Sequence, residues 1–101
     1  SGYHGGTAAL RWPFREWGAI AVIAGHDHHY ERALVDGFPY FVNGAGGKHL
    51  YALNDPISGS VARYNRDYGA MWITATPQTI TFQFFTRAGE EIDTFTEGTQ
   101  P

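Results

Sequence analysis

The sequence predicts a layered α/β (α+β) fold in which one helix precedes several strands and the chain ends in an antiparallel meander. The first observation is a change of period, because helical spacing of apolar residues before Gly18 gives way to alternation after it. The second is composition, since 3 Trp, 6 Tyr and 7 Phe among 101 residues supply enough large apolar area for one core. We therefore expect residues 1–101 to form a single domain.

The predicted helix runs from an N-cap at Thr7 to about Trp17, where the following glycine ends it. Leu10, Phe14 and Trp17 have i, i+4, i+7 spacing and would share a face that packs on the core. Pro13 lies inside this segment and should kink or restart the helix.

Three short strands are expected next. Residues 19–24 form an apolar run typical of a buried strand, which Gly25 closes. Residues 30–35 and 38–42 are predicted to be two strands of a hairpin, because Asp36 and Gly37 form a strong turn signal between them.

The C-terminal half predicts a long irregular connection and then three strands. The connection covers residues 51–69, and the strands cover residues 70–76, 79–87 and 91–96. Ile80, Phe82 and Phe84 alternate with polar residues, so they should face the core of an antiparallel meander.

Charge and cysteine content exclude several classes of function. Lysine and arginine number 7 against 10 acidic residues, so the chain lacks the basic excess needed to neutralise a nucleic-acid backbone. It has no cysteine, which leaves imidazole and oxygen as ligands for a transition metal. No apolar run approaches the roughly 18 residues of a membrane span. We expect neither nucleic acid nor a membrane among its partners.

The densest cluster of ionisable side chains follows the first predicted strand. His26 and His28 are two residues apart, and in an extended chain this spacing places both imidazoles on one side. Paired metal ions in phosphoryl-transfer sites lie about 3.5–4 Å apart, so one histidine can serve each ion. Asp27 and His29 would point the other way, toward outer-sphere or structural roles. The alternative is that the histidines only cap the strand at the surface.

The neighbouring residues have simpler interpretations. Tyr30 is expected to be packed rather than catalytic, and Glu31 and Arg32 form either a structural ion pair or part of the site. Residues 43–48 lack the spacing of a phosphate-binding loop and are interpreted as a glycine turn close to the histidines. His49 is expected to be a surface residue.

Two motifs together resemble a known family. Gly25-His26-Asp27-His28-His29-Tyr30-Glu31-Arg32 resembles the last metal-binding motif of the calcineurin-like metallophosphoesterases, in the purple acid phosphatase-like branch that has Gly-His-x-His-x-Tyr-Glu-Arg. Tyr40-Phe41-Val42-Asn43-Gly44-Ala45-Gly46-Gly47 is similar to the strand and glycine turn that follow it in that branch. Trp12-Pro13-Phe14 and Trp17-Gly18-Ala19 resemble the preceding helix.

The resemblance implies the C-terminal half of a metallophosphoesterase-type β-sandwich flanked by helices. It implies hydrolysis of phosphate-ester substrates at a two-metal site, with His26 at the divalent ion and His28 at the ion that is ferric in purple acid phosphatases. Fe, Zn or Mn are the metals expected in the full enzyme. His4 would lie on the substrate side, in a loop that precedes the last motif, unless it belongs to a flexible terminus.

The family's other ligand motifs, Gly-Asp-x-Gly, Gly-Asp-x-x-Tyr and Gly-Asn-His, do not occur in the chain. We therefore expect residues 1–101 to be a partial domain, inactive in isolation and with partial or no metal occupancy. Aromatic surface left uncovered would favour a homo-oligomer. The resemblance favours an extracytoplasmic or secreted protein. The alternative is a non-catalytic metal-binding, structural or interaction module rich in β-structure.

Overall fold

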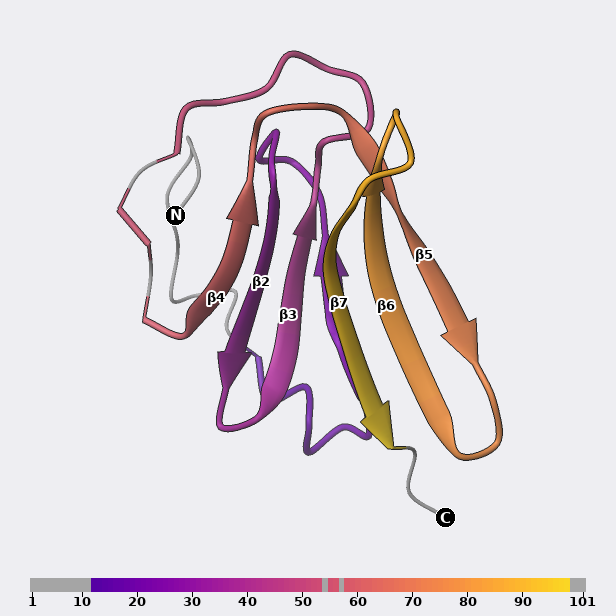
Figure 1. Cartoon of the computed structure of the whole chain (residues 1–101). Helices are drawn as coiled ribbons and strands as arrows, with labels where there is room; N and C mark the ends of the chain where they lie inside the picture. The colour runs from indigo at the N-terminus through magenta and orange to yellow at the C-terminus, as the bar shows by residue number, and fades with distance from the viewer. Residues whose placement is uncertain (1–11, 54, 57, 99–101) are drawn as a thin grey trace.

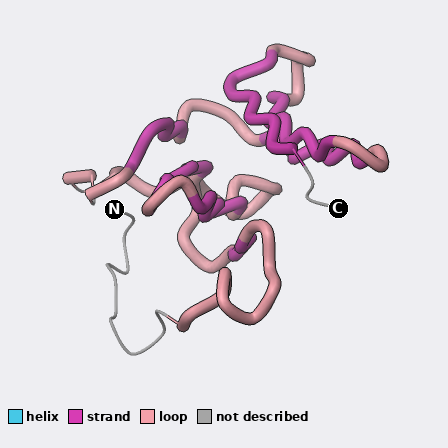
Figure 2. Tube along the Cα trace, turned by 90° about the horizontal axis from the view of Figure 1, so that it is seen from below, coloured by secondary structure: helices cyan, strands magenta, loops and turns pink. Residues whose placement is uncertain are grey.

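The computed structural model describes residues 12–53, 55–56 and 58–98, which form seven strands in two facing sheets (Figure 1). The first sheet has the strand order β1-β3-β2-β4 and the second has the order β5-β6-β7. The strands of the first sheet are β1 (Val22–Ala24), β2 (Tyr30–Val35), β3 (Phe38–Asn43) and β4 (Ser60–Tyr64). Those of the second are β5 (Gly69–Ala75), β6 (Thr79–Thr86) and β7 (Glu91–Gly98). Viewed from below, the three C-terminal strands lie apart from the others as a layer of their own (Figure 2).

The predicted α/β class is wrong, because every regular element in the described part of the chain is a strand. The predicted helix corresponds in residues 12–18 to a succession of turns, in which the Trp17 amide donates to the carbonyls of Pro13 and Phe14 at 3.2 and 3.1 Å. Pro13 has no amide proton to extend a helix, and Gly18 leaves the helical region with a φ of 90°. Residues 7–11 of that helix lie outside the described residues. None of the described residues forms a helix long and apolar enough to cross a membrane.

The β2–β3 hairpin forms where the sequence predicted it. Asp36 and Gly37 have φ values of 52° and 76°, which is the type I′ geometry that matches the twist of a two-residue hairpin. β1 is shorter than predicted and pairs with β3 in parallel, so the loop that carries the histidines leads from β1 to the other side of β3.

β4 was not predicted, because it lies inside the segment interpreted as an irregular connection. It pairs antiparallel with β2, and the register shifts between Arg32 and Ala33. The strand carries Ser60 and Arg63 among apolar residues and follows Gly59, so its own sequence has little strand signal. Pairing with β2 supplies the order that local propensity does not.

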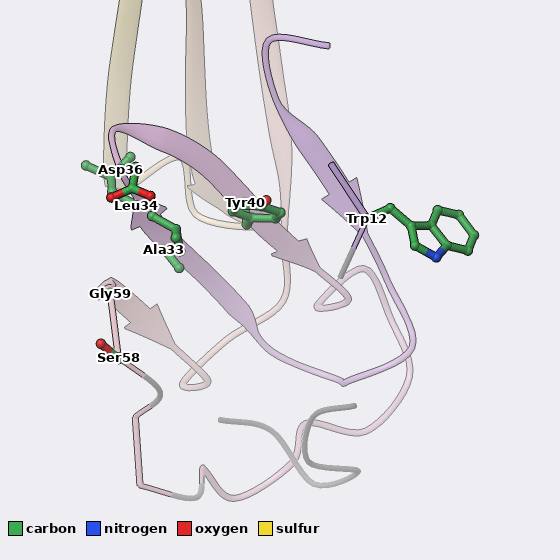
Figure 3. Close-up of a pocket in the computed structure, with 8 residues that line it drawn as sticks. Trp12, Ala33, Leu34, Asp36, Tyr40, Ser58 and Gly59 are labelled. Atoms are coloured by element: carbon green, nitrogen blue, oxygen red, sulfur yellow. The ribbon is translucent and has the colours of Figure 1, made fainter. Parts of the chain in front are cut away.

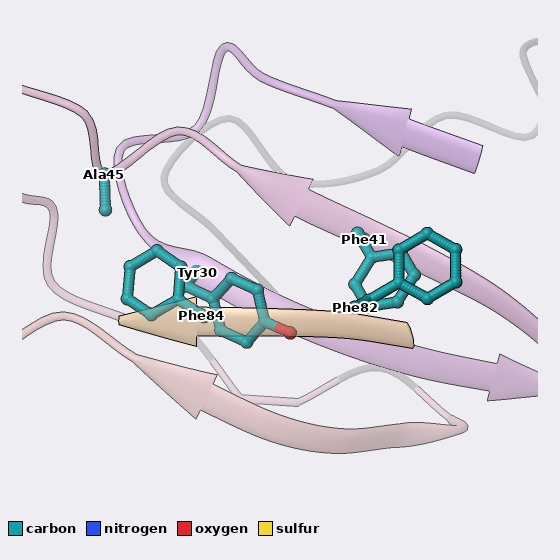
Figure 4. Packing of buried hydrophobic residues seen from close by; sticks show 5 residues of the cluster. All are labelled: Tyr30, Phe41, Ala45, Phe82 and Phe84. Carbon is teal, nitrogen blue, oxygen red and sulfur yellow. The ribbon is translucent and has the colours of Figure 1, made fainter. Parts of the chain in front are cut away.

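The core lies between the two sheets. Tyr30 on β2 stacks on Phe84 at 4.3 Å between ring centroids, and Phe41 on β3 contacts Phe82 at 4.6 Å (Figure 4). All four side chains are at most 2% exposed. Phe82 and Phe84 point inward from the meander as predicted, and truncating such a ring to alanine costs about 3–5 kcal/mol.

Candidate functional site

The histidine loop begins directly after β1. The strand ends at Ala24, and the Asp27 and His29 amides donate to the carbonyls of Gly25 and Asp27 at 3.0 and 2.9 Å. His26 has a φ of 77°, which lies in the left-handed region that non-glycine residues seldom adopt. The segment is therefore a series of tight turns, and the two-residue repeat of an extended strand does not apply to His26 and His28.

His28 is held by a second segment of the chain. Its Nδ1 lies 2.8 Å from the His49 carbonyl oxygen, its ring stacks on Tyr51 at 4.0 Å, and its own carbonyl accepts the Tyr51 amide at 3.0 Å. A carbonyl oxygen only accepts hydrogen bonds, so Nδ1 carries the proton in this contact. In the neutral imidazole the lone pair then lies on Nε2, where it is able to bind a donor or a cation.

His49 was expected to be a surface residue, and it also belongs to this cluster. It is exposed, and its ring centroid lies 5.2 Å from that of His28. No local signal in the sequence links the two residues, since they are 21 positions apart. Sequence reasoning therefore missed both His49 and Tyr51.

The described residues do not complete a two-metal site. No three or more histidine, cysteine, aspartate or glutamate residues among them are grouped so as to hold a metal ion. Metal ligation by His26 and His28 stays a prediction. His4, expected on the substrate side, lies outside the described residues.

His29, which directly precedes β2, and Glu31 on β2 form a buried pair. They are 0% and 1% exposed, and His29 Nε2 lies 2.9 Å from Glu31 Oε1. The Ser60 hydroxyl donates to Glu31 Oε2 at 2.6 Å, which ties β4 to β2. His29 Nδ1 is buried and has no hydrogen-bond partner among the described residues. Of the two roles expected for His29, outer-sphere or structural, the buried contact with Glu31 fits the structural one.

Arg32 turns to the interior between the sheets rather than to Glu31. Its Nε and one terminal nitrogen donate to the Asp93 carboxylate on β7 at 2.8 and 3.1 Å, and the Tyr30 hydroxyl donates to the same carboxylate at 2.7 Å. These hydrogen bonds to Asp93 raise the pKa of Arg32 above its ordinary value. Burial, followed by the hydrogen bond to Asp93, raises the pKa of Tyr30. Arg32 also lies over the Phe95 ring at 4.9 Å.

The glycine turn after β3 packs against the histidine loop, as expected. The Gly44 amide donates to the His29 carbonyl at 3.0 Å. A β-carbon at Gly44 would overlap the Asp27 carbonyl group, so the position needs glycine for close backbone approach. Gly46, two residues on, has open space at the same point.

A separate hollow of about 640 Å³ lies on the side of the first sheet that faces away from the second (Figure 3). Ala33 on β2, Tyr40 on β3 and Ser58 before β4 are among the residues that line it. No histidine is among the described residues that line this hollow. It is therefore distinct from the loop that carries His26 and His28.

No family model matches the chain, and no curated protein matches it. Among solved structures the chain is similar to one described as GAP50, the anchor in the inner membrane complex of Plasmodium, with 19% sequence identity and a TM-score of 0.81. The match covers 100% of this chain and 33% of that one, so the chain spans about a third of the length of the structure it matches. At this identity the likeness shows the fold alone.

These findings contradict the family assigned from residues 25–32. No family model supports membership of the calcineurin-like metallophosphoesterases, and the solved chain that this chain resembles is described as an anchor. The physical reason is visible in the motif itself. Tyr30, Glu31 and Arg32 serve packing and internal pairing, so their occurrence together does not require a catalytic site.

Proposed function

We propose that this chain is a non-catalytic structural and interaction module, in which the segment from His29 to Arg32 fastens the two sheets and the β4 strand together. The proposal rests on one observation: the charged side chains of the motif, Glu31 and Arg32, bind other side chains of the same chain. Glu31 accepts from Ser60 and contacts His29, while Arg32 pairs with Asp93. Glu31 and Arg32 are 1% and 9% exposed, so a substrate in the solvent does not reach their side chains.

The Arg32–Asp93 pair is a buried ion pair that links the two sheets. Both side chains are about one-tenth exposed, at 10% and 9%, and the carboxylate receives three donors. Removing one partner of such a pair leaves an uncompensated buried charge, which costs about 3–5 kcal/mol. Two strands from different sheets are thereby fixed relative to each other.

Phosphate-ester hydrolysis, the function expected from the motif, has less support. A two-metal mechanism needs several ligands for each ion. The described residues bring no such group together. The similar solved chain is described as an anchor, which agrees with a structural role. The match covers only a third of that chain's length.

A second candidate is non-catalytic binding of a metal ion at His28. It is favoured by the contact of His28 Nδ1 with the His49 carbonyl, which leaves the Nε2 lone pair for a ligand. Fe, Zn and Mn remain the ions to test. Zinc titration followed by calorimetry separates the candidates, because binding that His28→Ala abolishes favours the second and no binding favours a purely structural module.

A double-mutant cycle tests the structural role. Arg32→Met and Asp93→Asn should each lower the free energy of unfolding by about 3 kcal/mol, because each leaves the other charge buried alone. The double variant has no unpaired charge and keeps an acceptor for Tyr30, so its loss should fall short of the sum by about 2 kcal/mol. Urea unfolding supplies the values, and additivity within about 0.5 kcal/mol would refute the proposal.

A further inference from the structure

One end of the sandwich is open, and its inner surface is apolar. Ile23 on β1 is paired in register with Phe41 on β3, and Ile73 on β5 is paired with Phe82 on β6. Residues paired across neighbouring strands project from the same face of a sheet. Because Phe41 and Phe82 meet between the sheets at 4.6 Å, the two isoleucines lie one strand further out on the same inner faces.

The exposure of the side chains rises sharply from the inner strands β3 and β6 to the outer strands β1 and β5. Phe41 and Phe82 are 1% and 2% exposed, whereas Ile23 and Ile73 are 46% and 45% exposed. β1 and β5 are the outermost strands of their sheets at this end, so each also presents an edge to which another strand can bind (Figure 1). The core therefore ends at two half-exposed isoleucines, each on a strand with an edge left unpaired by the described strands.

The two edges run in opposite directions. β1 is parallel to β3, and the first residue of β5, Gly69, donates its amide to Ala45, which follows the end of β3, at 3.0 Å. β5 then runs back along the sandwich, antiparallel to β3 and β1 (Figure 1). A two-fold axis parallel to the strands preserves these directions while it exchanges the two layers.

We propose that this open end binds a second copy of the chain, with β1 of each copy pairing antiparallel with β5 of the other. The four-stranded sheet of one copy then continues into the three-stranded sheet of its partner, and Ile23 and Ile73 of both copies enclose one continuous core. This deepens the structural role proposed above by naming the partner and the surface.

A second copy is the occupant because it supplies both complements at once. It offers a β5 edge to pair with β1 and a β1 edge to pair with β5. The distance between the two sheets is the same in both copies, and each pair of strands runs antiparallel. Neither strand contains a charged residue, Val-Ile-Ala in β1 and Gly-Ala-Met-Trp-Ile-Thr-Ala in β5. Two chains of net charge −3 therefore meet here without placing like charges together.

Light scattering coupled to size-exclusion chromatography tests the proposal on the purified 101-residue chain. The wild type should have twice the mass of the 11.2 kDa chain over a range of concentrations. Ile23→Lys or Ile73→Lys should raise the dimer dissociation constant about 100-fold, because each places a lysine in an apolar contact. Val61→Lys is the matched control, since Val61 is 55% exposed on β4 at the other end and should leave the dimer intact.

A compensating pair sharpens the test. Ile23→Lys combined with Ile73→Glu places opposite charges on neighbouring strands of the two copies and should recover part of the association. Circular dichroism checks that each variant keeps its β-structure. A wild-type chain that stays at the mass of one copy would overturn the proposal, as would dissociation by Val61→Lys to the same extent. Either result leaves the Arg32–Asp93 cycle unaffected, so failure here is distinguishable from failure of the structural role.

Discussion

Arg32 and Asp93 are 61 residues apart in sequence and form a two-point ion pair between β2 and β7, the strands of opposite sheets. The Tyr30 hydroxyl donates a third hydrogen bond to the same carboxylate. This arrangement gives the residues of the Tyr-Glu-Arg segment a defined structural task, because their side chains reach both layers and the β4 strand.

Ser60→Ala should lower the free energy of unfolding by about 1–3 kcal/mol, since it removes the donor to a buried carboxylate oxygen of Glu31. Ser58→Ala is the control, because Ser58 is exposed and its loss should change stability by less than about 0.5 kcal/mol. Urea unfolding of both variants decides the matter. Equal effects would mean that the Glu31–Ser60 contact does not stabilise the fold.

Stability should fall in alkali because of Tyr30. The folded state raises the pKa of this hydroxyl, so the stabilisation is fully present below the ordinary tyrosine pKa of 10.0 and is lost as the pH rises above it, where the unfolded chain releases its proton first. Urea unfolding between pH 8 and pH 11, as well as absorbance titration of the tyrosines, measures this loss. Tyr30→Phe should flatten the alkaline fall, and an unchanged slope in that variant would exclude Tyr30 as its cause.

Gly44→Ala should destabilise the fold by about 1–3 kcal/mol, because the added methyl group overlaps the Asp27 carbonyl and forces the histidine loop to shift. Gly46→Ala meets open space and serves as the matched control. Thermal unfolding of the two variants compares them directly. A Gly44→Ala variant as stable as the control would show that the loop moves aside at no cost.

His28 should be found with its proton on Nδ1 when the imidazole is neutral. The reason is that Nδ1 contacts a carbonyl oxygen, that of His49, at 2.8 Å. Nitrogen-15 NMR of the imidazole distinguishes the two tautomers, and Tyr51→Ala, which removes the stacked ring, should make the ring more mobile. A neutral His28 with its proton on Nε2 would contradict the contact.

Local patterns predicted the parts of this fold that depend on neighbours in sequence. The Asp36-Gly37 turn gave the β2–β3 hairpin, and the alternation around Phe82 and Phe84 gave the inward face of β6. The helix was a wrong inference because the spacing of Phe14 and Trp17 suits a helix, yet Pro13 and Gly18 limit the chain to turns.

The remaining features depend on contacts between distant residues. β4 acquires its order from pairing with β2, and Arg32 finds Asp93 only once both sheets are assembled. The partnership of His28 with His49 and Tyr51 likewise requires the loop after β3 to return to the first strand's end. No pattern within either segment indicates these contacts, so the sequence alone left Glu31 and Arg32 open between a structural ion pair and a part of the site.

The central claim, that this chain is structural rather than catalytic, is tested most directly by its rate of aryl phosphate hydrolysis. The rigorously purified chain should be assayed with Zn²⁺, Mn²⁺ and Fe³⁺ in turn, beside a His28→Ala variant and a buffer blank. We predict that both proteins match the blank with every metal. Metal-dependent turnover by the wild type that His28→Ala abolishes would contradict the account.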